Sequence, residues 1–469
     1  MTSSQGRTRF RELARELRKS RTGMTGLALV LFFIGLSVYV PIAVTPAELS
    51  KWNNLEAWLD NPAAAAPEWS GFLTGRQLPR TELIEDFSLK TFESEGTIIR
   101  EYQLNYDFIY DDFPTSLILK LTPKFQAQSP LLQITWEKPN GDQINLQATV
   151  LQTSDRQERF FLSTDSQVRG QVASYVSLKV GTEVSSDDVE VEAALLAESS
   201  PGMNHAITAT PLKGEHFLKA RMISFDETDS IETIRLSIGG KTFGLFGTDS
   251  NRRDLATGIL WGAPIALAIG LSVSVIGTMI GLILGVFSGY FGGTWKDEGI
   301  QRFTDFMIAL PTLPMLVLIA IVFRIDVLLL VIWLTVFGWM GVAKVTRTIA
   351  LQIREEFYVD AARSLGQRDF SIVFKHIAPQ ILPYTFAVIA LGVPGVIFTE
   401  AALSFLGLGD PTIVTWGKIL RDAQLAGATV NGFWWWVTIP GALIVLVALG
   451  FGLLGNALDR ILQPQLKVR

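Results

Sequence analysis

Few side chains in this sequence could perform covalent chemistry. The 469 residues include no cysteine, and the three histidines, His205, His216 and His376, are scattered along the chain. A thiolate nucleophile and a cysteine-based metal site are therefore excluded, and a histidine-based zinc site is not expected. Gly239-Gly240-Lys241-Thr242 is similar to the end of a phosphate-binding loop, but such a loop needs glycine where Arg235 stands. We predict no catalysis, cofactor or metal in this chain.

Binding without catalysis is indicated by the polar segment 360–379, which lies between two strongly apolar segments. Ala361 and Ala362 are small, so the surface of another protein could approach a helix closely at this point. Gly366 is suited to end that helix in the left-handed conformation. This part of the sequence predicts a short helix that stops at a glycine turn.

The residues after this turn predict a second short helix. Asp369 is a good N-cap for a helix over 370–378, and Pro379 would end or kink that helix before the next apolar segment. Two short helices joined by a glycine turn would form a rigid projection that fits a groove on a partner. The alternative is an ordinary amphipathic loop.

The elements that must position this segment are apolar and of membrane length. The chain is 48% hydrophobic and its mean hydropathy is +0.31, which is too apolar for an average soluble protein of this length. Roughly 20 apolar residues are enough to cross a bilayer. We expect six spanning helices, at 23–45 and at roughly 258–290, 303–323, 326–343, 381–405 and 434–457.

Basic residues predict the orientation of these helices, because they favour the cytoplasmic side of a membrane. We interpret the first apolar run, at 23–45, as a retained helix rather than a cleaved signal peptide, because the apolar core of a signal peptide would be shorter. We expect both termini, 291–302 and 344–380 in the cytoplasm, and 324–325 and 406–433 outside. The basic residues before the first run, all within 1–22, are Arg7, Arg9, Arg11, Arg15, Arg18, Lys19 and Arg21.

Residues 46–245 form a separate region without an apolar run of membrane length. They hold 29 acidic and 17 basic side chains, a net charge of −12, whereas the rest of the chain has a net charge of +7. Pro139-Asn140-Gly141-Asp142 indicates the turn of a hairpin. We predict a folded, β-rich extracytoplasmic domain inserted after the first span. Strands are expected near 116–121, 132–136, 144–148, 160–162, 175–180 and 234–238.

A stripe of small residues indicates close helix packing. Gly277, Gly281, Gly285 and Gly289 recur every four residues within one expected span. Glycines at this spacing give a helix a smooth face against which a neighbouring helix can pack in lipid. The functional alternative is a helix interface that moves during transport.

The polar segment resembles the "EAA" loop of ABC importer permeases, whose pattern is E-A-A, three residues, Gly, nine residues and I-x-L-P. Asp360, Ala361, Ala362, Gly366 and Pro379 fall at that spacing. Three positions depart from the pattern, where Asp360 replaces glutamate, His376 replaces isoleucine and Ala378 replaces leucine. In that family the loop docks the permease onto its ATPase.

Flanking segments are similar to permeases of the dipeptide/oligopeptide/nickel family. Tyr358–Gly366 is similar to Y-V-E-A-A-R-A-L-G, and Lys375–Gln380 to R-H-I-L-P-N. Residues 246–254 resemble the family segment L-G-T-D-x-x-G-R-D, but Arg252 stands where glycine is usual. The residues of this chain that match that segment are Gly247, Thr248, Asp249, Arg253 and Asp254. Residues 400–409 match a periplasmic segment of the family almost letter for letter, and Trp416-Gly417 follows as expected. This second segment includes Glu400, Ser404, Gly407 and Gly409.

The resemblance covers 246–469 closely and 1–45 loosely, and it does not cover the insert. It implies an all-α polytopic inner-membrane protein with the type I importer permease fold, specifically the C-type permease subunit. It also implies a homologous second permease, two ATPases that bind ATP and magnesium, and an extracytoplasmic solute-binding protein, but no nucleic acid. Peptides are the commonest cargo of the family, and nickel and some sugars are also carried.

Two other functions are compatible with a membrane protein that carries an outer domain. A membrane-anchored receptor or scaffold would use the outer domain and would not need the segment at 360–379. A proton-driven transporter would need buried acidic residues, and few ionisable residues lie near membrane depth. Those residues are Glu400, Asp326 and Arg324, all near expected helix ends.

Overall fold

The chain folds into two compact units. A computed structural model describes residues 15–94, 97–126, 128–323 and 326–462. Asn54–Ala256 form one unit, which we call the inserted unit, and the described residues up to Asn53 and from Thr257 form the other, the helical unit. These boundaries fall later than the expected 46 and 245. Arg7, Arg9, Arg11 and Arg324, on which parts of the expected topology rest, lie outside the described residues.

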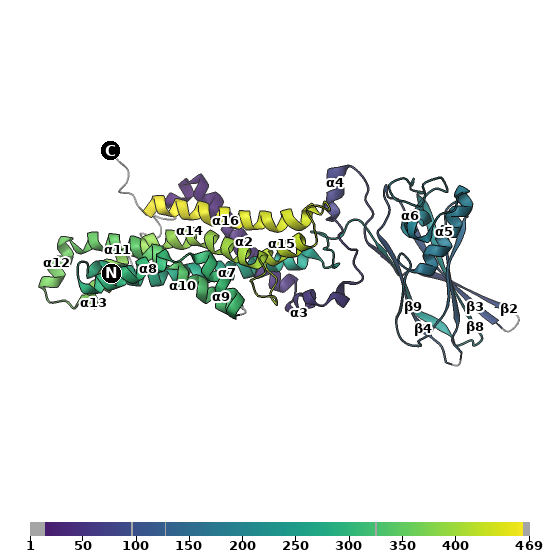
Figure 1. Ribbon diagram of the computed structural model, residues 1–469, viewed down its shortest axis with the longest axis horizontal. Coiled ribbons are helices and arrows are strands. Elements are labelled where there is room, and N and C mark those ends of the chain that lie inside the picture. Colours follow the sequence, from purple (N-terminus) through teal and green to yellow (C-terminus); the bar gives the residue numbers. More distant parts are fainter. Residues whose placement is uncertain (1–14, 95–96, 127, 324–325, 463–469) are drawn as a thin grey trace. The chain divides into compact units, whose positions relative to one another are not determined.

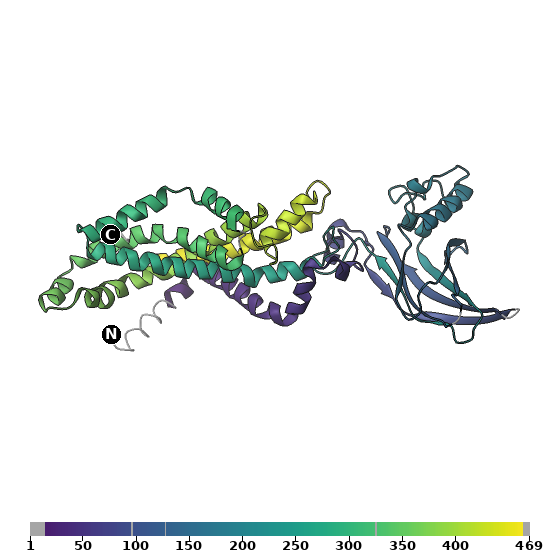
Figure 2. The ribbon, with the colours of Figure 1, turned by 60° about the horizontal axis from the view of Figure 1, so that its bottom comes forward.

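Long apolar helices make up most of the helical unit (Figures 1 and 2). By length and composition, five of those described could cross a membrane: α2, α7, α10 with α11, α13 with α14, and α16. The helices of this unit are α2 (Arg21–Ala43), α3 (Pro46–Ser50), α7 (Leu255–Tyr290), α8 (Trp295–Ala309), α9 (Thr312–Phe323), α10 (Val327–Gly338), α11 (Met340–Arg354), α12 (Phe357–Ser364), α13 (Asp369–Ile372), α14 (Ala378–Phe405), α15 (Trp416–Leu425) and α16 (Trp434–Leu462).

One expected span is not a continuous helix. The apolar run at 303–323 breaks between α8 and α9, which are bent by 77° relative to each other. Leu310 takes an extended conformation, with φ −72° and ψ 129°, directly before Pro311. Proline disfavours a helical conformation in the residue that precedes it and has no N–H to donate, so the helix ends there. Together, α8 and α9 count as a sixth membrane span only if they are taken as one broken span.

The glycine stripe of α7 lies against α11. A Cβ atom on Gly281 would lie 2.6 Å from the Trp339 carbonyl oxygen, and one on Gly289 would lie 2.6 Å from the Arg347 carbonyl oxygen. At Gly277 the nearest atom would be at an ordinary 3.6 Å. The two backbones therefore approach most closely toward the end of α7 that leads to α8.

The inserted unit is built on two antiparallel sheets. In the described part of this unit, their strand orders are β1-β9-β4-β7 and β2-β3-β8-β5-β6. The elements are α4 (Gly71–Thr74), β1 (Glu82–Ile84), β2 (Phe87–Ser94), β3 (Thr97–Phe108), β4 (Ser116–Lys124), β5 (Leu131–Glu137), β6 (Gln143–Val150), β7 (Glu158–Phe161), α5 (Ser166–Val180), α6 (Val191–Leu196), β8 (Gly214–Ser224) and β9 (Ser230–Gly239).

The hairpin expected around Pro139–Asp142 is present, because β5 pairs with β6 across this turn and Gly141 takes a φ of +86°. The strand expected at 175–180 is wrong, since these residues end α5. Asp165 caps the start of α5, and Gly181 ends it in the left-handed conformation. Val168, Val172 and Val176 recur at helical spacing and are buried, so the β-branched residues serve a helix face.

His216 lies fully buried in the core of the inserted unit. Its Nδ1 accepts a hydrogen bond from Trp136 Nε1 (3.3 Å), and its Nε2 therefore donates to the Leu212 carbonyl oxygen (2.9 Å). Burial lowers the pKa of His216 to about 4; the hydrogen bond to Leu212 opposes this shift, and the charge of Lys138 adds to it. A proton on Nδ1 would also point at the Trp136 N–H, so the folded unit requires the neutral ring.

We predict that the inserted unit loses stability as the pH falls below the unfolded pKa of histidine, about 6.5. The contribution of neutral His216 to the free energy of unfolding is complete above about pH 6.5 and is lost progressively toward pH 4, because the unfolded chain binds the proton more tightly. Between pH 7 and pH 5 the loss is about 2 kcal/mol, or roughly thirtyfold in hydrogen-exchange protection of β5 and β8. His216→Gln is expected to remove most of this pH dependence, whereas His205→Gln, at an exposed ring, should keep it.

Candidate functional site

Residues 357–380, here called the α12–α13 hairpin, lie at one end of the helical unit (Figure 1). After α12, Gly366 takes a φ of +77°. The N–H of Gln367 donates to the Ala362 carbonyl (3.2 Å), which closes the last turn of the helix. The left-handed conformation predicted for Gly366 is therefore present.

Side-chain hydrogen bonds brace the two arms of this hairpin. Gln380 Nε2 donates to the Tyr358 hydroxyl (2.6 Å), and His376 Nε2 is hydrogen bonded to Gln367 Oε1 (2.9 Å). Asp360 accepts a hydrogen bond from Arg363 of the same helix (3.2 Å), and both side chains are exposed. Tyr358 and His376 thus join segments that the glycine turn separates, so the hairpin is held as one piece.

The two small residues of α12 face opposite ways. Ala361 is exposed, but Ala362 is buried against Val359, Ile372 and Ile377 of the same hairpin. The expectation that both alanines face a partner is therefore wrong for Ala362. Positions 359 and 362 are three residues apart, which places them on one helix face.

The N-cap prediction for Asp369 is wrong, and of the two alternatives for Pro379 the end of a helix is wrong. Asp369 is the first residue of α13 rather than its N-cap, and its carboxylate accepts a hydrogen bond from the Tyr290 hydroxyl at the end of α7 (2.5 Å). Pro379 does not end a helix, because the π-helical turn η5 (Val373–Ile377) runs directly into α14. Pro379 lies in the first turn of α14, where a proline is tolerated because the N–H it lacks is not needed there.

An ion pair that the sequence analysis did not single out joins α8 to α11. Arg347 donates from Nε and Nη2 to the two carboxylate oxygens of Asp297, both at 2.7 Å. Ser288 of α7 and the N–H of Gly293 donate to the same carboxylate. The Asp297 side chain is only 6% exposed. No spacing rule links residues fifty positions apart, so the only signal was a pair of opposite charges near expected span ends.

The outer surface of the hairpin is unusually apolar for a polar segment. Phe357, Leu365 and Phe370 are 91%, 82% and 68% exposed, and Phe374 is 54% exposed. A cluster of large exposed apolar side chains on a rigid element is typical of a protein interface. The hairpin thus offers apolar contacts on a support that is tied to α7 by Tyr290 and Asp369.

The segment 400–417 lies toward the opposite end of the helical unit (Figures 1 and 2). Ser404 donates to the buried Glu400 (2.7 Å), and Gly407, with a φ of +83°, ends α14. A Cβ atom on Gly409 would lie 2.2 Å from the Ser404 hydroxyl. Trp416 donates to the Ile259 carbonyl of α7 (2.8 Å). A cavity of about 490 Å³ opens here, lined by Asp326, Ser404, Gly407, Gly409, Asp410 and Arg421.

The segment 247–254 belongs to the inserted unit. Asp249 and Arg253 form a buried ion pair (2.5 Å), and Asp254 accepts from the N–H of Ala256 (2.9 Å). Burial raises the pKa of both Asp249 and Asp254, although the adjacent Arg253 opposes the shift at Asp249. Gly247 takes a φ of +76°.

This segment is bonded to the first residues of the inserted unit. The Thr248 hydroxyl accepts from the N–H of Ala65 (2.9 Å) and donates to the Pro62 carbonyl (2.8 Å). The N–H of Ala64 donates to the Asp249 carbonyl (2.9 Å). The beginning and the end of the inserted unit are therefore held side by side.

Arg252, which departs from the resembled pattern, takes a φ of +65°. That conformation favours glycine, and it explains why glycine is usual at this position. The arginine adds bonds that glycine could not make, because its guanidinium donates to the carbonyls of Leu59 (3.2 Å) and Asn61 (2.9 Å). The side chain of Arg252 thus bonds to residues of the insert, which precedes this segment in the sequence.

Comparison with known proteins gives consistent matches for the helical unit. Residues 277–468 match the family described as binding-protein-dependent transport system inner membrane component. The chain is 34% identical over 223 residues to the oligopeptide transport system permease protein OppC of Bacillus subtilis, covering 47% of this chain and 72% of that protein. It is also 34% identical to the dipeptide transport system permease protein DppC of the same organism, covering 47% of this chain and 69% of that protein.

Among solved structures, the chain matches the inward-facing MetNI methionine ABC transporter, with 19% identity and a TM-score of 0.35, over 44% of this chain and 95% of that one. This likeness is too weak to support an argument. The sequence matches suffice, because the identity and coverage establish the relationship. The chain belongs to the family of binding-protein-dependent transport system inner-membrane components, which are ABC transporter permeases.

Proposed function

We propose that this chain is the permease subunit that forms half of the translocation pathway of an ABC importer. One observation carries the proposal beyond family membership: the braced α12–α13 hairpin exposes Phe357, Leu365 and Phe370 at one end of the helical unit. An apolar, rigid projection of this kind suits a groove on a cytoplasmic ATPase. Neither a receptor anchor nor a scaffold has a need for it.

The proposed topology has six spans, with α8 and α9 counted as one broken span. Both termini and the α12–α13 hairpin are then cytoplasmic, and 400–417 and the inserted unit are extracytoplasmic. Opposite ends of the helical unit carry the hairpin and 400–417, as this topology requires. The basic residues of 344–380 support the cytoplasmic assignment.

The proposed partners are a homologous second permease, two ATPase subunits that bind ATP and magnesium, and a solute-binding protein. Closure of the ATPases around ATP would move the two hairpins of the permease pair. The Asp369–Tyr290 bond and the Asp297–Arg347 pair would carry that movement into α7, α8 and α11. The spans would then alternate between inward-open and outward-open states.

Peptides are the proposed cargo, because the similar permeases named above belong to oligopeptide and dipeptide transport systems. In the described residues the helical unit holds few charged side chains at membrane depth, and this suits a neutral pathway for zwitterionic solutes. Specificity would then rest mainly with the solute-binding protein.

The test is purification of the tagged chain from native membranes, followed by identification of the proteins that accompany it. We expect two ATPases and a second permease with the wild type, and loss of the ATPases with Gly366→Trp or Leu365→Asp. The matched control is Gly432→Trp, because Gly432 also has a positive φ (+76°) and open space around its Cβ position. Recovery of the chain without ATPases, even after cross-linking at the hairpin, would favour the anchored-receptor function instead.

A further inference from the structure

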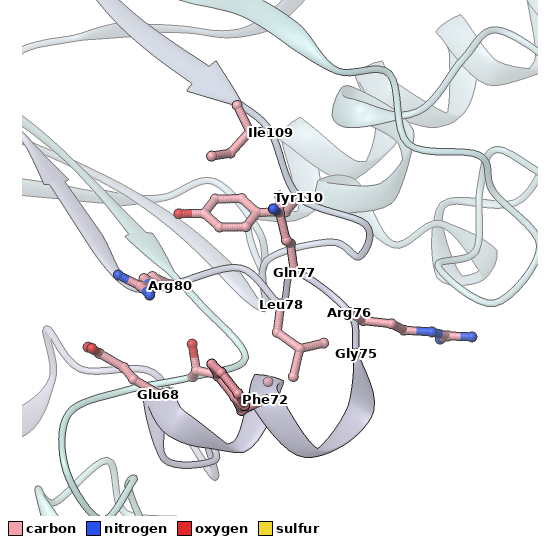
Figure 3. Close-up of a pocket in the computed structure, with 11 residues that line it drawn as sticks. Glu68, Phe72, Gly75, Arg76, Gln77, Leu78, Arg80, Ile109 and Tyr110 are labelled. Atoms are coloured by element: carbon pink, nitrogen blue, oxygen red, sulfur yellow. The ribbon is translucent and has the colours of Figure 1, made fainter.

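In a part that the family resemblance does not cover, the inserted unit contains a cavity of about 600 Å³ (Figure 3). This volume lies in the range of small-ligand sites. Figure 3 shows Ile109 and Tyr110 along one side, Glu68 and Phe72 along the other, and Arg80 and Leu78 between them. Apolar surface and two opposite charges therefore face one space.

The walls of this cavity are fixed by hydrogen bonds that leave the side chains of Glu68, Phe72 and Arg80 unused. The N–H of Gln77 donates to Asp111 (3.0 Å), and the N–H of Asp111 donates to the Gln77 carbonyl (2.9 Å). The N–H and hydroxyl of Thr242 both donate to the Pro79 carbonyl, each at 3.1 Å. The segment 75–81 is thus anchored at both ends, so the cavity is formed before a ligand arrives.

The apolar part of the cavity contains large side chains that are exposed to solvent. Phe72 is 96% exposed and Ile109 is 49% exposed, whereas Tyr110 is buried behind them. An apolar ligand group placed between Phe72 and Ile109 would remove their surfaces from water, at about 25 cal/mol per Å². Exposed aromatic and aliphatic groups around a preformed space are typical of a binding site.

The two charges are available for a ligand. Within the described part of the chain, the Arg80 guanidinium makes no hydrogen bond or ion pair with another side chain, and Arg80 is exposed. Glu68 accepts the N–H of Gly244 at Oε1 (3.2 Å), which leaves Oε2 for a second donor. Of the other charged residues near the cavity, Lys241 bonds to Asp112 (2.7 Å) and Lys213 bonds to Asp111 (2.6 Å). Arg76 also lines the cavity, but its side chain points away from Arg80 and Glu68 in Figure 3.

We propose that this cavity binds the carboxyl-terminal residue of a short peptide that ends in an apolar side chain. The terminal carboxylate pairs with Arg80, a guanidinium being suited to hold a carboxylate with two hydrogen bonds. The side chain lies between Phe72 and Ile109, and a main-chain N–H or α-ammonium of the peptide donates to Glu68. The biological role, capture of cargo outside the membrane, rests on the proposed function of the chain.

The experiment measures binding to the full chain in lipid nanodiscs by saturation-transfer NMR, with three probes: the tripeptide Ala-Ala-Phe, its carboxyl-terminal amide, and Ala-Ala-Ala. We expect the wild type to bind the acid about tenfold more tightly than the amide, because a charge-assisted hydrogen bond is lost. Arg80→Gln is expected to bind the acid and the amide equally. Glu68→Gln should weaken both, and Phe72→Ala should remove the preference for Ala-Ala-Phe over Ala-Ala-Ala.

The matched control is Arg156→Gln, at another exposed arginine of the inserted unit that does not line the cavity, and it should retain the discrimination between acid and amide. Equal binding of acid and amide to the wild type, or discrimination that survives in Arg80→Gln, would overturn the proposal. The proposal would also be overturned if the wild type bound none of the peptides and Arg80→Gln no longer retained a solute-binding protein. The cavity would then be a docking site for that protein. Because none of these substitutions touches the α12–α13 hairpin, failure of peptide binding with ATPases still bound would refute this inference alone.

Discussion

Replacing Gly285 with alanine is expected to force α7 and α11 apart and to destabilise the helical unit strongly. The added Cβ atom would lie 1.9 Å from the Thr346 hydroxyl oxygen and 2.4 Å from the Ala343 carbonyl oxygen. The backbone of a packed helix cannot move aside as a flexible side chain can. Overpacking typically costs about 1–3 kcal/mol, and contact with backbone atoms places this substitution at or above the upper end.

The same change at Gly277 is the matched control, because its Cβ atom would meet nothing closer than 3.6 Å. Size-exclusion chromatography of the detergent-solubilised, fluorescently tagged variants distinguishes the two. Gly277→Ala should give the wild-type peak, and Gly285→Ala should give a smaller peak with more aggregate. Equal profiles for the two variants would mean that the close approach of α7 and α11 does not support the fold.

Removing Arg347 is expected to destabilise the helical unit strongly. Arg347→Ala leaves the Asp297 carboxylate, 6% exposed, without its cation. Breaking a buried ion pair at one partner costs about 3–5 kcal/mol, because a desolvated charge remains. We expect the thermal unfolding midpoint in detergent to fall by roughly 10 °C.

Two further variants test this explanation. Adding Asp297→Asn to Arg347→Ala should recover part of the lost midpoint, because the uncompensated charge is removed. Arg302→Ala breaks an ion pair with Glu298 in which both side chains are exposed, so it should leave the midpoint unchanged. A similar fall for Arg302→Ala and Arg347→Ala would show that burial of Asp297 is not the cause.

Local signals in the sequence predicted local structure well. The turn at Gly366, the hairpin at Pro139–Asp142 and the apolar helices α2, α7, α14 and α16 follow from residue conformation and from hydrophobic runs. Each of these signals acts over a few neighbouring residues, so it does not depend on the rest of the fold.

Features that depend on distant or directional contacts were not predictable. The bend at Leu310–Pro311 is a different case, because Pro311 is a local signal that hydropathy does not register. Ala361 and Ala362 are chemically identical, and only the packing of Val359 against the rest of the hairpin decides which one faces outward. The residues at 175–180 have strand propensity, but Asp165 and Gly181 fix the ends of a helix around them.

The bonds that join the two ends of the inserted unit have an evolutionary consequence. Because Thr248 and Arg252 hold residues 59–65 next to 247–254, the chain leaves and returns at neighbouring points. When the two ends of a segment are adjacent, the length and sequence of that segment can change without moving the chain on either side. Loops between residues 66 and 246 are therefore expected to tolerate changes in length, because the bonds between 59–65 and 247–254 keep the two ends of the unit together.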